Sequence, residues 1–495
     1  MVRFPCVRRL LLVSLLAASP YSSRADAGLI DIGERTLVAD LKWLVDRRVV
    51  GLPLATWPLP AAAVRDAVAN ADQSGLKDAE RSALQRVQRT LERLAGPGEV
   101  SLQANPERHL LLDGEQRTRA QAEASVTLRH ASDALLARLR VTSLHEPIAR
   151  RDNGAVLDGS YLGVRGDGVV ALFGVVDRWW GPGVMQSPLL SDVAPPIPTL
   201  IVRRSADTAP EPALLQWIGA WGYEFSLGRM RDYRPAGTRT IGMRFYARPT
   251  PGLELGAARF IAWGGAGNPR GFRALFDALL GNSNVEPGEP DPSNEVSGFD
   301  LRWSQPVFGD AAWAGYAHVI GEDEAGSLPT HLFGTLGLQF KHAVGAQRLE
   351  WTVEGTDTQT GRLFGFRSRQ GAGAAYRHST YVGGHYHLGL PIGALIGGGG
   401  HSLGLLLAWL PEAGSSIDRV GFSAVRARVN AAGPEPLHAH FGVPAQIDEV
   451  GLRLEARTGS VRWHVGLSVQ RDTSQQRRSV GLLGGVEVPF EALMR

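Results

Sequence analysis

The hydrophobic pattern changes near Gly98 from a helical period to a period of about 2 residues, and this change constrains the fold more than any other feature. The clearest alternating runs are Leu135–Thr142, Leu332–Lys341, Val450–Arg457 and Val461–Gln470. Successive side chains of a strand point to opposite faces, so each run predicts a strand with one apolar face and one polar or ionised face. Strands of roughly 9 to 11 residues with these two faces are typical of a membrane barrel, whose outer side meets lipid and whose lumen is wet.

A soluble sandwich or a propeller would also have alternating strands. Those strands tend to be roughly 5 or 6 residues long, however, and the runs here are longer. At roughly 20 to 22 residues for a strand and its connection, residues 98–495 predict about 18 strands. The expected fold class is therefore mainly β, a transmembrane antiparallel β-barrel of about 18 strands preceded by a three-helix bundle.

The first residues have the features of a secretory signal peptide. Three arginines precede the apolar run Leu10–Ala18, and the small residues Ala25 and Ala27 predict cleavage before Gly28. The apolar run is about half of the roughly 20 residues that a membrane-spanning helix requires. Removal of residues 1–27 takes away four arginines and one aspartate, so the formal net charge falls from +3 to zero. The mature chain therefore gives no electrostatic reason to expect nucleic acid as a partner.

The single cysteine, Cys6, lies in this signal. The predicted mature chain has no thiol, which excludes cysteine nucleophiles and thiolate metal sites. It also contains no run of 18 apolar residues, which excludes helical membrane spans.

Residues 31–97 predict a compact helical unit. Apolar residues recur at helical spacing in Glu34–Val49, Ala61–Ala71 and Leu76–Ala95. Amphipathic helices of this length are marginally stable alone, so we expect their apolar faces to dock on a larger body.

Four motifs in the strand region occur in a specific order. They are DRWWGPG at 177–183, PIPTLIVRRS at 196–205, GEDEAGSLP at 321–329 and GLPIGALIGGGGHSLG at 389–404. In this order they resemble the capsule assembly Wzi family, outer-membrane barrels that act as lectins for capsular polysaccharide. The resemblance extends from about Asp31 to near the C-terminus.

This resemblance implies a cleaved signal peptide at 1–27, a periplasmic helical bundle at 31–97 that plugs the barrel, and an outer-membrane barrel at 98–495 with long extracellular loops. It also implies a Gram-negative outer membrane and a monomer that binds capsular or related exopolysaccharide, without a cofactor and without enzymatic activity. Outer-membrane lipid, lipopolysaccharide and the barrel assembly machinery are the other implied partners.

With the helices in the periplasm, counting strands assigns each connection to a side of the membrane, from a first strand at about Val100–Leu112. The short links His130–Asp133, Gly166–Gly168, Arg248–Gly252, Val307–Asp310 and His342–Gly345 are predicted on the periplasmic side. The connections Glu146–Asp158, Asp177–Pro196, Gly264–Ser297, Gly321–Pro329 and Asp357–Ala375 are predicted outside. Short inner turns and long outer loops are the usual asymmetry of such barrels.

Asp177, Arg178, Trp179 and Trp180 are the first candidate ligand residues. An indole face can stack on a sugar ring, while Asp and Arg make directional bonds to hydroxyl or carboxylate groups. Packing at the barrel mouth or in an interfacial aromatic belt is the alternative, because adjacent residues of a strand point to opposite sides.

Glu322, Asp323 and Glu324 are the second candidate set. Three neighbouring carboxylates could bind calcium or sugar hydroxyls, although the alternating spacing of a calcium loop is absent. An arginine-paired or solvated loop is the alternative. A glycosidase pair would need a defined carboxylate separation that adjacency does not provide.

His385, His387, His438 and His440 occur as two H-x-H pairs that could share a strand face and hold a metal. No carboxylate pattern completes such a site, so polar loop residues are the preferred interpretation and no metal is expected. The sequence leaves a saccharide porin as the main alternative to a lectin, and an outer-membrane hydrolase as the third hypothesis.

Overall fold

The computed structural model describes residues 28–495 except 116–117, 207, 281–291, 326–327, 361, 364–365, 368–374, 432 and 495. The predicted signal peptide lies outside the described residues.

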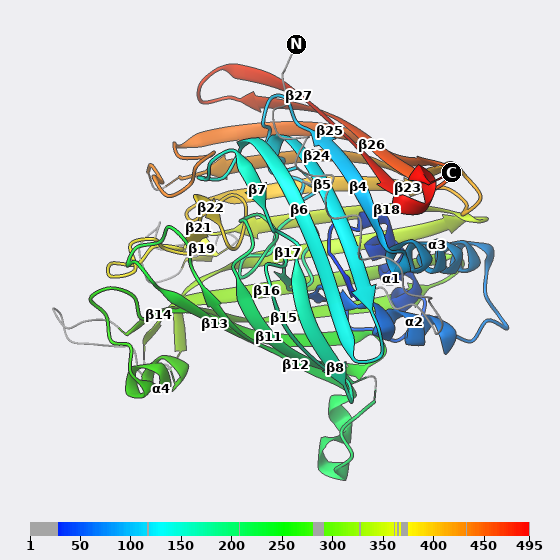
Figure 1. Cartoon of the computed structure of the whole chain (residues 1–495), viewed down its shortest axis with the longest axis horizontal. Coiled ribbons are helices and arrows are strands. Elements are labelled where there is room, and N and C mark those ends of the chain that lie inside the picture. The colour runs from blue at the N-terminus through cyan, green and yellow to red at the C-terminus, as the bar shows by residue number, and fades with distance from the viewer. Residues whose placement is uncertain are drawn as a thin grey trace.

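The described residues form a closed antiparallel barrel (Figure 1). Its strands are β4 (Gly98–Ala104), β5 (Ala120–Ala131), β6 (Leu135–Pro147), β7 (Gly154–Val156), β8 (Tyr161–Gly166), β9 (Val169–Gly174), β11 (Thr199–Ala206), β12 (Ala220–Arg229), β13 (Arg239–Thr250), β14 (Leu253–Trp263), β15 (Ser293–Val307), β16 (Ala311–Ala325), β17 (Leu328–Val344), β18 (Gln347–Asp357), β23 (His401–Leu410), β24 (Ile417–Val429), β25 (Ala445–Thr458), β26 (Val461–Asp472) and β27 (Arg477–Pro489). Because β7 and β8 both pair with β6, they are two parts of one strand, and the barrel has 18 strands in the described part of the chain. The last strand, β27, pairs with the first, β4, and closes the wall.

The wall has an apolar outside and a polar inside. In β17, Leu336, Leu338 and Phe340 are 44, 54 and 43% exposed, whereas the intervening Gln339 and Lys341 are 4 and 1% exposed. The same alternation holds in β25 and β26, as the sequence predicts. An exterior of half-exposed leucine, valine and phenylalanine would be unfavourable in water and matches a lipid-facing wall.

Three helices gather at one end of the barrel, which we call the helix end (Figure 1). They are α1 (Arg35–Asp46), α2 (Ala61–Ala69) and α3 (Asp78–Ala95). The short links that the sequence places on the periplasmic side lie at this end, as contacts from Arg48 to Pro251 and from Lys77 to Asp310 demonstrate. The long connections begin at the opposite end, which we call the loop end, but the connection predicted outside at Asp177–Pro196 turns from it into the barrel, where Trp179 pairs with Trp57. That the helix end faces the periplasm remains a prediction.

Shorter elements complete the chain. They are β1 (Leu29–Ile30), β2 (Thr56–Trp57), β3 (Leu59–Pro60), β10 (Trp179–Trp180), η2 (Ala213–Ile218), α4 (Phe272–Leu280), β19 (Arg362–Leu363), β20 (Phe366–Arg367), β21 (Tyr386–His387), β22 (Leu390–Pro391) and α5 (Phe490–Leu493). None of the helices in the described ranges has the length and apolarity of a membrane-spanning helix.

Two boundaries differ from the sequence prediction. The first barrel strand ends at Ala104 rather than near Leu112, because the chain then turns into the lumen, where Leu110 and Leu112 are buried. The expected loop at 321–329 is largely strand, because β16 and β17 stay paired as far as Ala325 and Leu328. The apolar residues after Ala104 contribute to the interior of the barrel, and the residues up to Ala325 and from Leu328 extend a strand pair.

Candidate functional site

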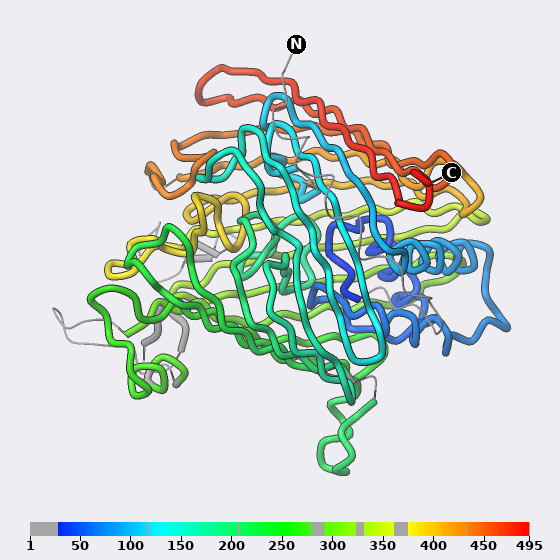
Figure 2. The backbone as a smooth tube through the Cα atoms, in the orientation of Figure 1, coloured from blue at the N-terminus to red at the C-terminus, as the bar shows by residue number. Residues whose placement is uncertain are grey.

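Four stretches of chain occupy the barrel lumen, and we call them the inserted segments. They are residues 28–60, 105–115 with 118–119, 175–198 and 375–400. A single apolar core joins the last three with the strand wall, and it includes Leu112, Trp180, Leu189 and Tyr376. Figure 2 shows the N-terminal segment, in blue, surrounded by strands near the helix end. The lumen is therefore largely filled by the protein's own chain.

The first inserted segment is tied to the wall by buried ion pairs. Asp46 at the end of α1 accepts hydrogen bonds from Arg302 at 2.7 and 2.9 Å and from Lys341 at 2.7 Å. Asp40, two turns earlier in α1, contacts Arg348 of β18 at 2.9 Å and Arg86 of α3 at 2.7 Å. Both aspartates are fully buried, so α1 is fixed inside the mouth of the barrel by charge pairs that water does not screen.

Glutamates of the wall hold the inserted segments by accepting hydrogen bonds from their backbone N–H groups. Glu254 accepts from Leu54 and Ala55, each at 2.9 Å. Glu322 accepts from the Tyr376 amide at 2.6 Å. Backbone amides at the tip of an irregular segment have no ladder partners, so a carboxylate that accepts from them satisfies otherwise costly buried donors.

Glu354 of β18 accepts hydrogen bonds from more groups than the other wall glutamates named here. It accepts hydrogen bonds from the amides of Val184 at 2.6 Å, Met185 at 3.1 Å and Gln186 at 2.7 Å, and from the Tyr316 hydroxyl at 2.7 Å. One carboxylate thus fixes three consecutive residues of the segment that follows the DRWWGPG motif.

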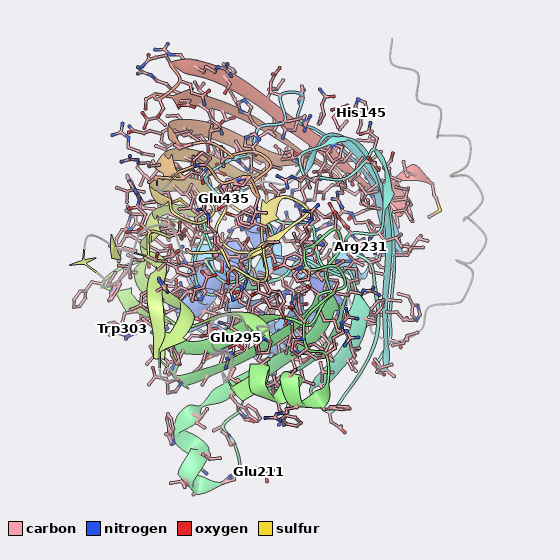
Figure 3. All side chains as sticks on the ribbon, turned by 90° about the vertical axis from the view of Figure 1, so that its left-hand side faces the viewer. His145, Glu211, Arg231, Glu295, Trp303 and Glu435 are labelled. Carbon is pink, nitrogen blue, oxygen red and sulfur yellow. The ribbon has the colours of Figure 1, made fainter. Side chains whose placement is uncertain are left out.

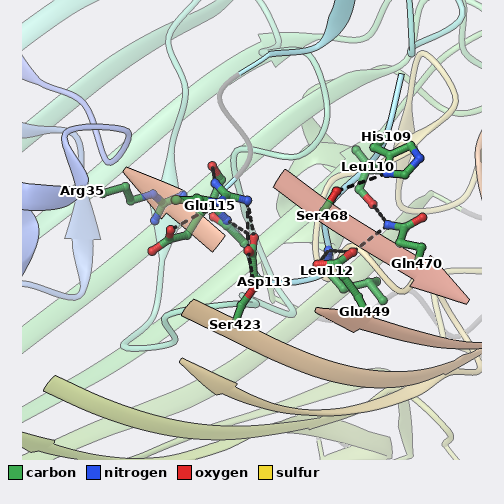
Figure 4. Close-up of polar contacts among 12 residues, drawn as sticks. Arg35, His109, Leu110, Leu112, Asp113, Glu115, Ser423, Glu449, Ser468 and Gln470 are labelled. Atoms are coloured by element: carbon green, nitrogen blue, oxygen red, sulfur yellow. Dashed lines mark hydrogen bonds and ion pairs between the residues drawn. The ribbon is translucent and has the colours of Figure 1, made fainter. Parts of the chain in front are cut away.

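Figure 4 shows how the segment after β4 is held. Glu449 accepts from the Leu112 amide at 3.1 Å and from Gln470 at 2.6 Å. Asp113 pairs with Arg453 at 3.0 Å, and Glu115 pairs with Arg419. Burial tends to raise the pKa of Glu115, but Arg419 and Arg453 outweigh it and lower the pKa well below the ordinary range. The pair with Arg419 is therefore ionised at pH 7.

The structure places the two tryptophans of the first candidate set inside the lumen. β10 pairs with β2, so that Trp179 lies opposite Trp57 and Trp180 opposite Thr56. Trp179 and Trp180 are 1 and 0% exposed. In this conformation neither ring is available to a ligand outside the barrel, which favours the packing alternative.

Asp177 and Arg178 also lie inside, in different surroundings. Arg178 is buried beside Trp180 and donates to Ser226 at 2.7 Å. Asp177 pairs with Arg119 at 2.7 Å, and burial raises the pKa of Asp177 to about 6 although Arg119 acts to lower it. Asp177 lines a polar cavity of about 160 Å³ between the first inserted segment and the wall. The other charged lining residues include Asp31, Glu99, Glu123, Arg129, Arg138 and Arg140.

Of the second candidate set, the structure describes only the side chain of Glu322. Glu322 points into the lumen with 1% exposure and holds the Tyr376 amide. The side chains of Asp323 and Glu324 lie outside the described part of the chain. The structure therefore assigns a loop-positioning contact to Glu322.

Three histidines of the two H-x-H pairs contact backbone carbonyls of the loops. His385 contacts the Leu189 carbonyl at 2.7 Å, His387 contacts that of Pro195 at 2.8 Å, and His438 contacts that of Leu395 at 2.9 Å. Burial lowers the pKa values of His385 and His438 to about 4, so both rings are neutral at pH 7. Within the described ranges no three potential metal ligands come together.

Arginine side chains are exposed on the surface of the loop end. Figure 3 views the protein from this end, with Arg231, Glu435 and His145 labelled. The exposed side chains here that we call the loop-end arginines are Arg150, Arg231, Arg234 and Arg377. Arg377 is anchored to buried Glu435 at 2.7 Å, and Arg150 donates to the Pro436 carbonyl. They provide cationic, forked donors on loops that the inserted segments hold in place.

Comparison with known proteins agrees with this architecture. The model of the family described as "Capsule assembly protein Wzi" matches residues 90–471. The chain belongs to the Wzi family. A relative from Klebsiella pneumoniae, an "Uncharacterized 55.8 kDa protein in cps region", is 31% identical over 355 residues, which are 70% of this chain and 68% of the relative.

A solved Wzi structure has the same fold. It superposes with a TM-score of 0.81 at 27% identity and covers 93% of this chain and 99% of its own. That protein is described as an outer membrane protein involved in group 1 capsule assembly in Escherichia coli and as a carbohydrate binding beta-barrel. OprD from Pseudomonas aeruginosa gives a TM-score of 0.42 at 10% identity over 79% of this chain and 92% of its own.

Sequence reasoning missed the wall glutamates Glu254, Glu354 and Glu449. Their signal is a lone carboxylate on the polar face of an alternating strand, and many solvated residues have the same signal. Only the three-dimensional position of the inserted segments distinguishes them.

Proposed function

We propose that this Wzi-family chain is an outer-membrane lectin that binds capsular or related exopolysaccharide and attaches it to the cell surface. The observation that carries the proposal is the set of arginines exposed at the loop end, in a family of which one solved member is described as carbohydrate binding. Guanidinium groups donate forked hydrogen bonds to carboxylates and to sugar hydroxyls. A repeating polymer could be retained by many weak contacts of this kind.

The proposed orientation places the loop end outside the cell and α1, α2 and α3 in the periplasm. A signal peptide at 1–27 would direct export, and the unit at 31–97 would close the barrel from the periplasmic side. The ion pairs of Asp40 and Asp46 support this closure, because they fix α1 within the wall. The barrel assembly machinery would insert the chain as a monomer among outer-membrane lipid and lipopolysaccharide.

Within this proposal, the buried candidate residues act beneath the binding surface. They are Asp177, Arg178, Trp179, Trp180 and Glu322. Their burial supports a role in holding the inserted segments, and hence the loops, in one conformation. The polymer would instead contact the loop-end arginines. No role for catalysis, a cofactor or a metal is proposed.

The direct test measures binding of the purified protein to the polysaccharide of the organism that produces it. We expect saturable binding that weakens in Arg231→Ala/Arg234→Ala and weakens with added salt, because charged contacts are screened. Arg81→Ala, a change of the same type in α3, is the matched control, since its side chain is 56% exposed at the helix end. Equal binding by the double variant and the wild type would contradict the proposal.

A deletion strain separates the lectin from its alternatives. The lectin predicts less cell-bound polymer, more free polymer and an unchanged polymer length. A change in polymer length or chemistry would instead support the hydrolase. Steady ion conductance by the intact protein in planar bilayers would support the porin.

A further inference from the structure

A row of charged side chains crosses the outside of the barrel near the loop end. The strand ladder pairs Arg426 with Asp448, Asp448 with Arg471, and Arg471 with Arg478. Residues paired in this way on neighbouring antiparallel strands lie side by side on the same face. These four residues, from β24, β25, β26 and β27, are called the exterior row.

The exterior row points away from the lumen. The side chain of Arg426 is 71% exposed, whereas the preceding Val425 is 4% exposed and belongs to the interior core. Arg471 is exposed, and the preceding Gln470 is bonded inside the barrel to Glu449. Arg478 is also exposed. Because side chains alternate along a strand, these neighbours fix the outward direction of the row.

The apolar belt of the wall begins directly beside this row. One step toward the helix end, the outward residues are Ala424, Val450, Val469 and Val480. The following step is Phe422, Leu452, Leu467 and Leu482. The leucines and valines of these steps are between 42 and 56% exposed. The exterior row therefore lies where the lipid-facing surface ends, which is the level of lipid headgroups.

The charge of the row favours an anion. Arg426 pairs with Asp448 at 2.6 and 3.3 Å, which compensates one guanidinium group. Three arginines against one aspartate leave an excess of two positive charges. Arg428, one step farther from the belt, is also exposed and adds a fourth guanidinium group to the same area. The planar fork of a guanidinium group binds phosphate through two parallel hydrogen bonds.

We propose that the exterior row is a binding site for the phosphate groups of lipopolysaccharide in the outer leaflet. The acyl chains of the glycolipid would cover the apolar belt on β24–β27, while its phosphate esters contact Arg426, Arg471 and Arg478. This inference rests on the outer-membrane placement given under Proposed function, and it does not depend on polysaccharide binding at the loop end.

The test uses the full-length protein in lipid nanodiscs and titrates bisphosphorylated lipid A, with retention measured by native mass spectrometry. Arg426→Gln/Arg471→Gln/Arg478→Gln is expected to weaken lipid A binding about fivefold per arginine, on the order of a hundredfold in total. Replacement of the same three residues by lysine keeps the charge and should lose only a part of this affinity. Arg81→Gln in α3 is the control that should change nothing.

Three outcomes would overturn the site. Equal binding of dephosphorylated lipid A would show that phosphate is not recognised. Unchanged binding by the triple glutamine variant would show that the three arginines do not contribute to binding. Displacement of lipid A by low concentrations of inorganic phosphate would indicate a free-phosphate site. Barrel assembly is checked by the mobility shift on gels with and without heating, and Arg471→Gln alone serves if the triple variant assembles poorly. Polysaccharide binding by the variant should be normal, so the two proposals can fail separately.

Discussion

Asp46 in α1 and Arg302 in β15 form a bidentate ion pair at 2.7 and 2.9 Å, and both side chains are buried. They lie 256 residues apart in the sequence. Lys341 of β17 contacts the same carboxylate, so one residue of a short helix joins two strands of the wall. The helix and the barrel are thereby parts of one electrostatic network.

Replacing Asp46 with Ala should release the first inserted segment. Arg302 and Lys341 would remain buried without their anion, a change that costs about 3 to 5 kcal/mol. We expect faster proteolysis of residues 28–60 in detergent and a rise in ion conductance through the barrel. Asp78→Ala in α3 is the control, because its carboxylate is 68% exposed. An Asp46→Ala protein with unchanged protease resistance would show that the ion pair does not hold the helix.

Replacing Trp179 or Trp180 with Ala should impair assembly rather than ligand binding. Each ring is fully buried, and the loss of a buried tryptophan costs about 3 to 5 kcal/mol. The expected result is a smaller fraction of protein with heat-modifiable mobility on gels. Trp217→Ala, which removes an indole that is 68% exposed, should assemble normally. Normal assembly of both buried variants combined with poor polysaccharide retention would support direct ligand contact instead.

Replacing Glu354 with Gln should loosen the segment after the DRWWGPG motif. A neutral amide has one acceptor oxygen, so it cannot satisfy the three amides of Val184, Met185 and Gln186, and the expected loss is about 1 to 3 kcal/mol. Hydrogen exchange at these amides should become faster while the strands keep their protection. Glu412→Gln, an exposed change at the helix end, should leave exchange as it is in the wild type.

As the pH falls, the loops at the loop end should lose stability at a higher pH than the strands of the wall. The folded pKa values of His385 and His438 are about 4, lower than the ordinary 6.5, because both rings are buried. The histidines of the unfolded loops bind protons as the pH falls through 6.5, whereas those of the folded loops bind protons only near pH 4. The stability that the neutral histidines contribute is therefore fully present above pH 6.5 and is lost as the pH falls from 6.5 to 4. Each histidine accounts for about 3 kcal/mol.

The measurement is limited proteolysis at Arg377 between pH 7.5 and 4.5. Cleavage should increase toward the lower pH, and His438→Gln should reduce this dependence, because glutamine keeps an N–H donor but does not titrate. A pH profile that is the same in the variant and the wild type would exclude His438 as the origin of the effect.

The barrel could be predicted from the sequence because strand alternation is a local property. Leu336, Leu338 and Phe340 face outward and Lys341 faces inward, as their spacing requires. The helices α1 and α3 were also predictable from their apolar stripes. These signals need no knowledge of distant residues.

The contents of the lumen could not be predicted in the same way. The aromatic DRWWGPG motif is equally compatible with an outer loop and with an inserted segment, and its burial depends on β2, which lies more than a hundred residues earlier. Likewise, the contact between Glu354 and Val184 spans 170 residues. Pairings of this range are properties of the closed barrel and have no local signature.

The closure of β27 against β4 has a consequence for biogenesis. The chain leaves β4 at Ala104 and enters the lumen at once, where Leu112 and Asp113 bond to Glu449 and Arg453 of β25 and to Ser423 of β24. These late hairpins can reach their final contacts only when the earlier segment is already inside. Maturation of this protein should therefore couple the closing of the wall to the entry of residues 105–115 into the lumen.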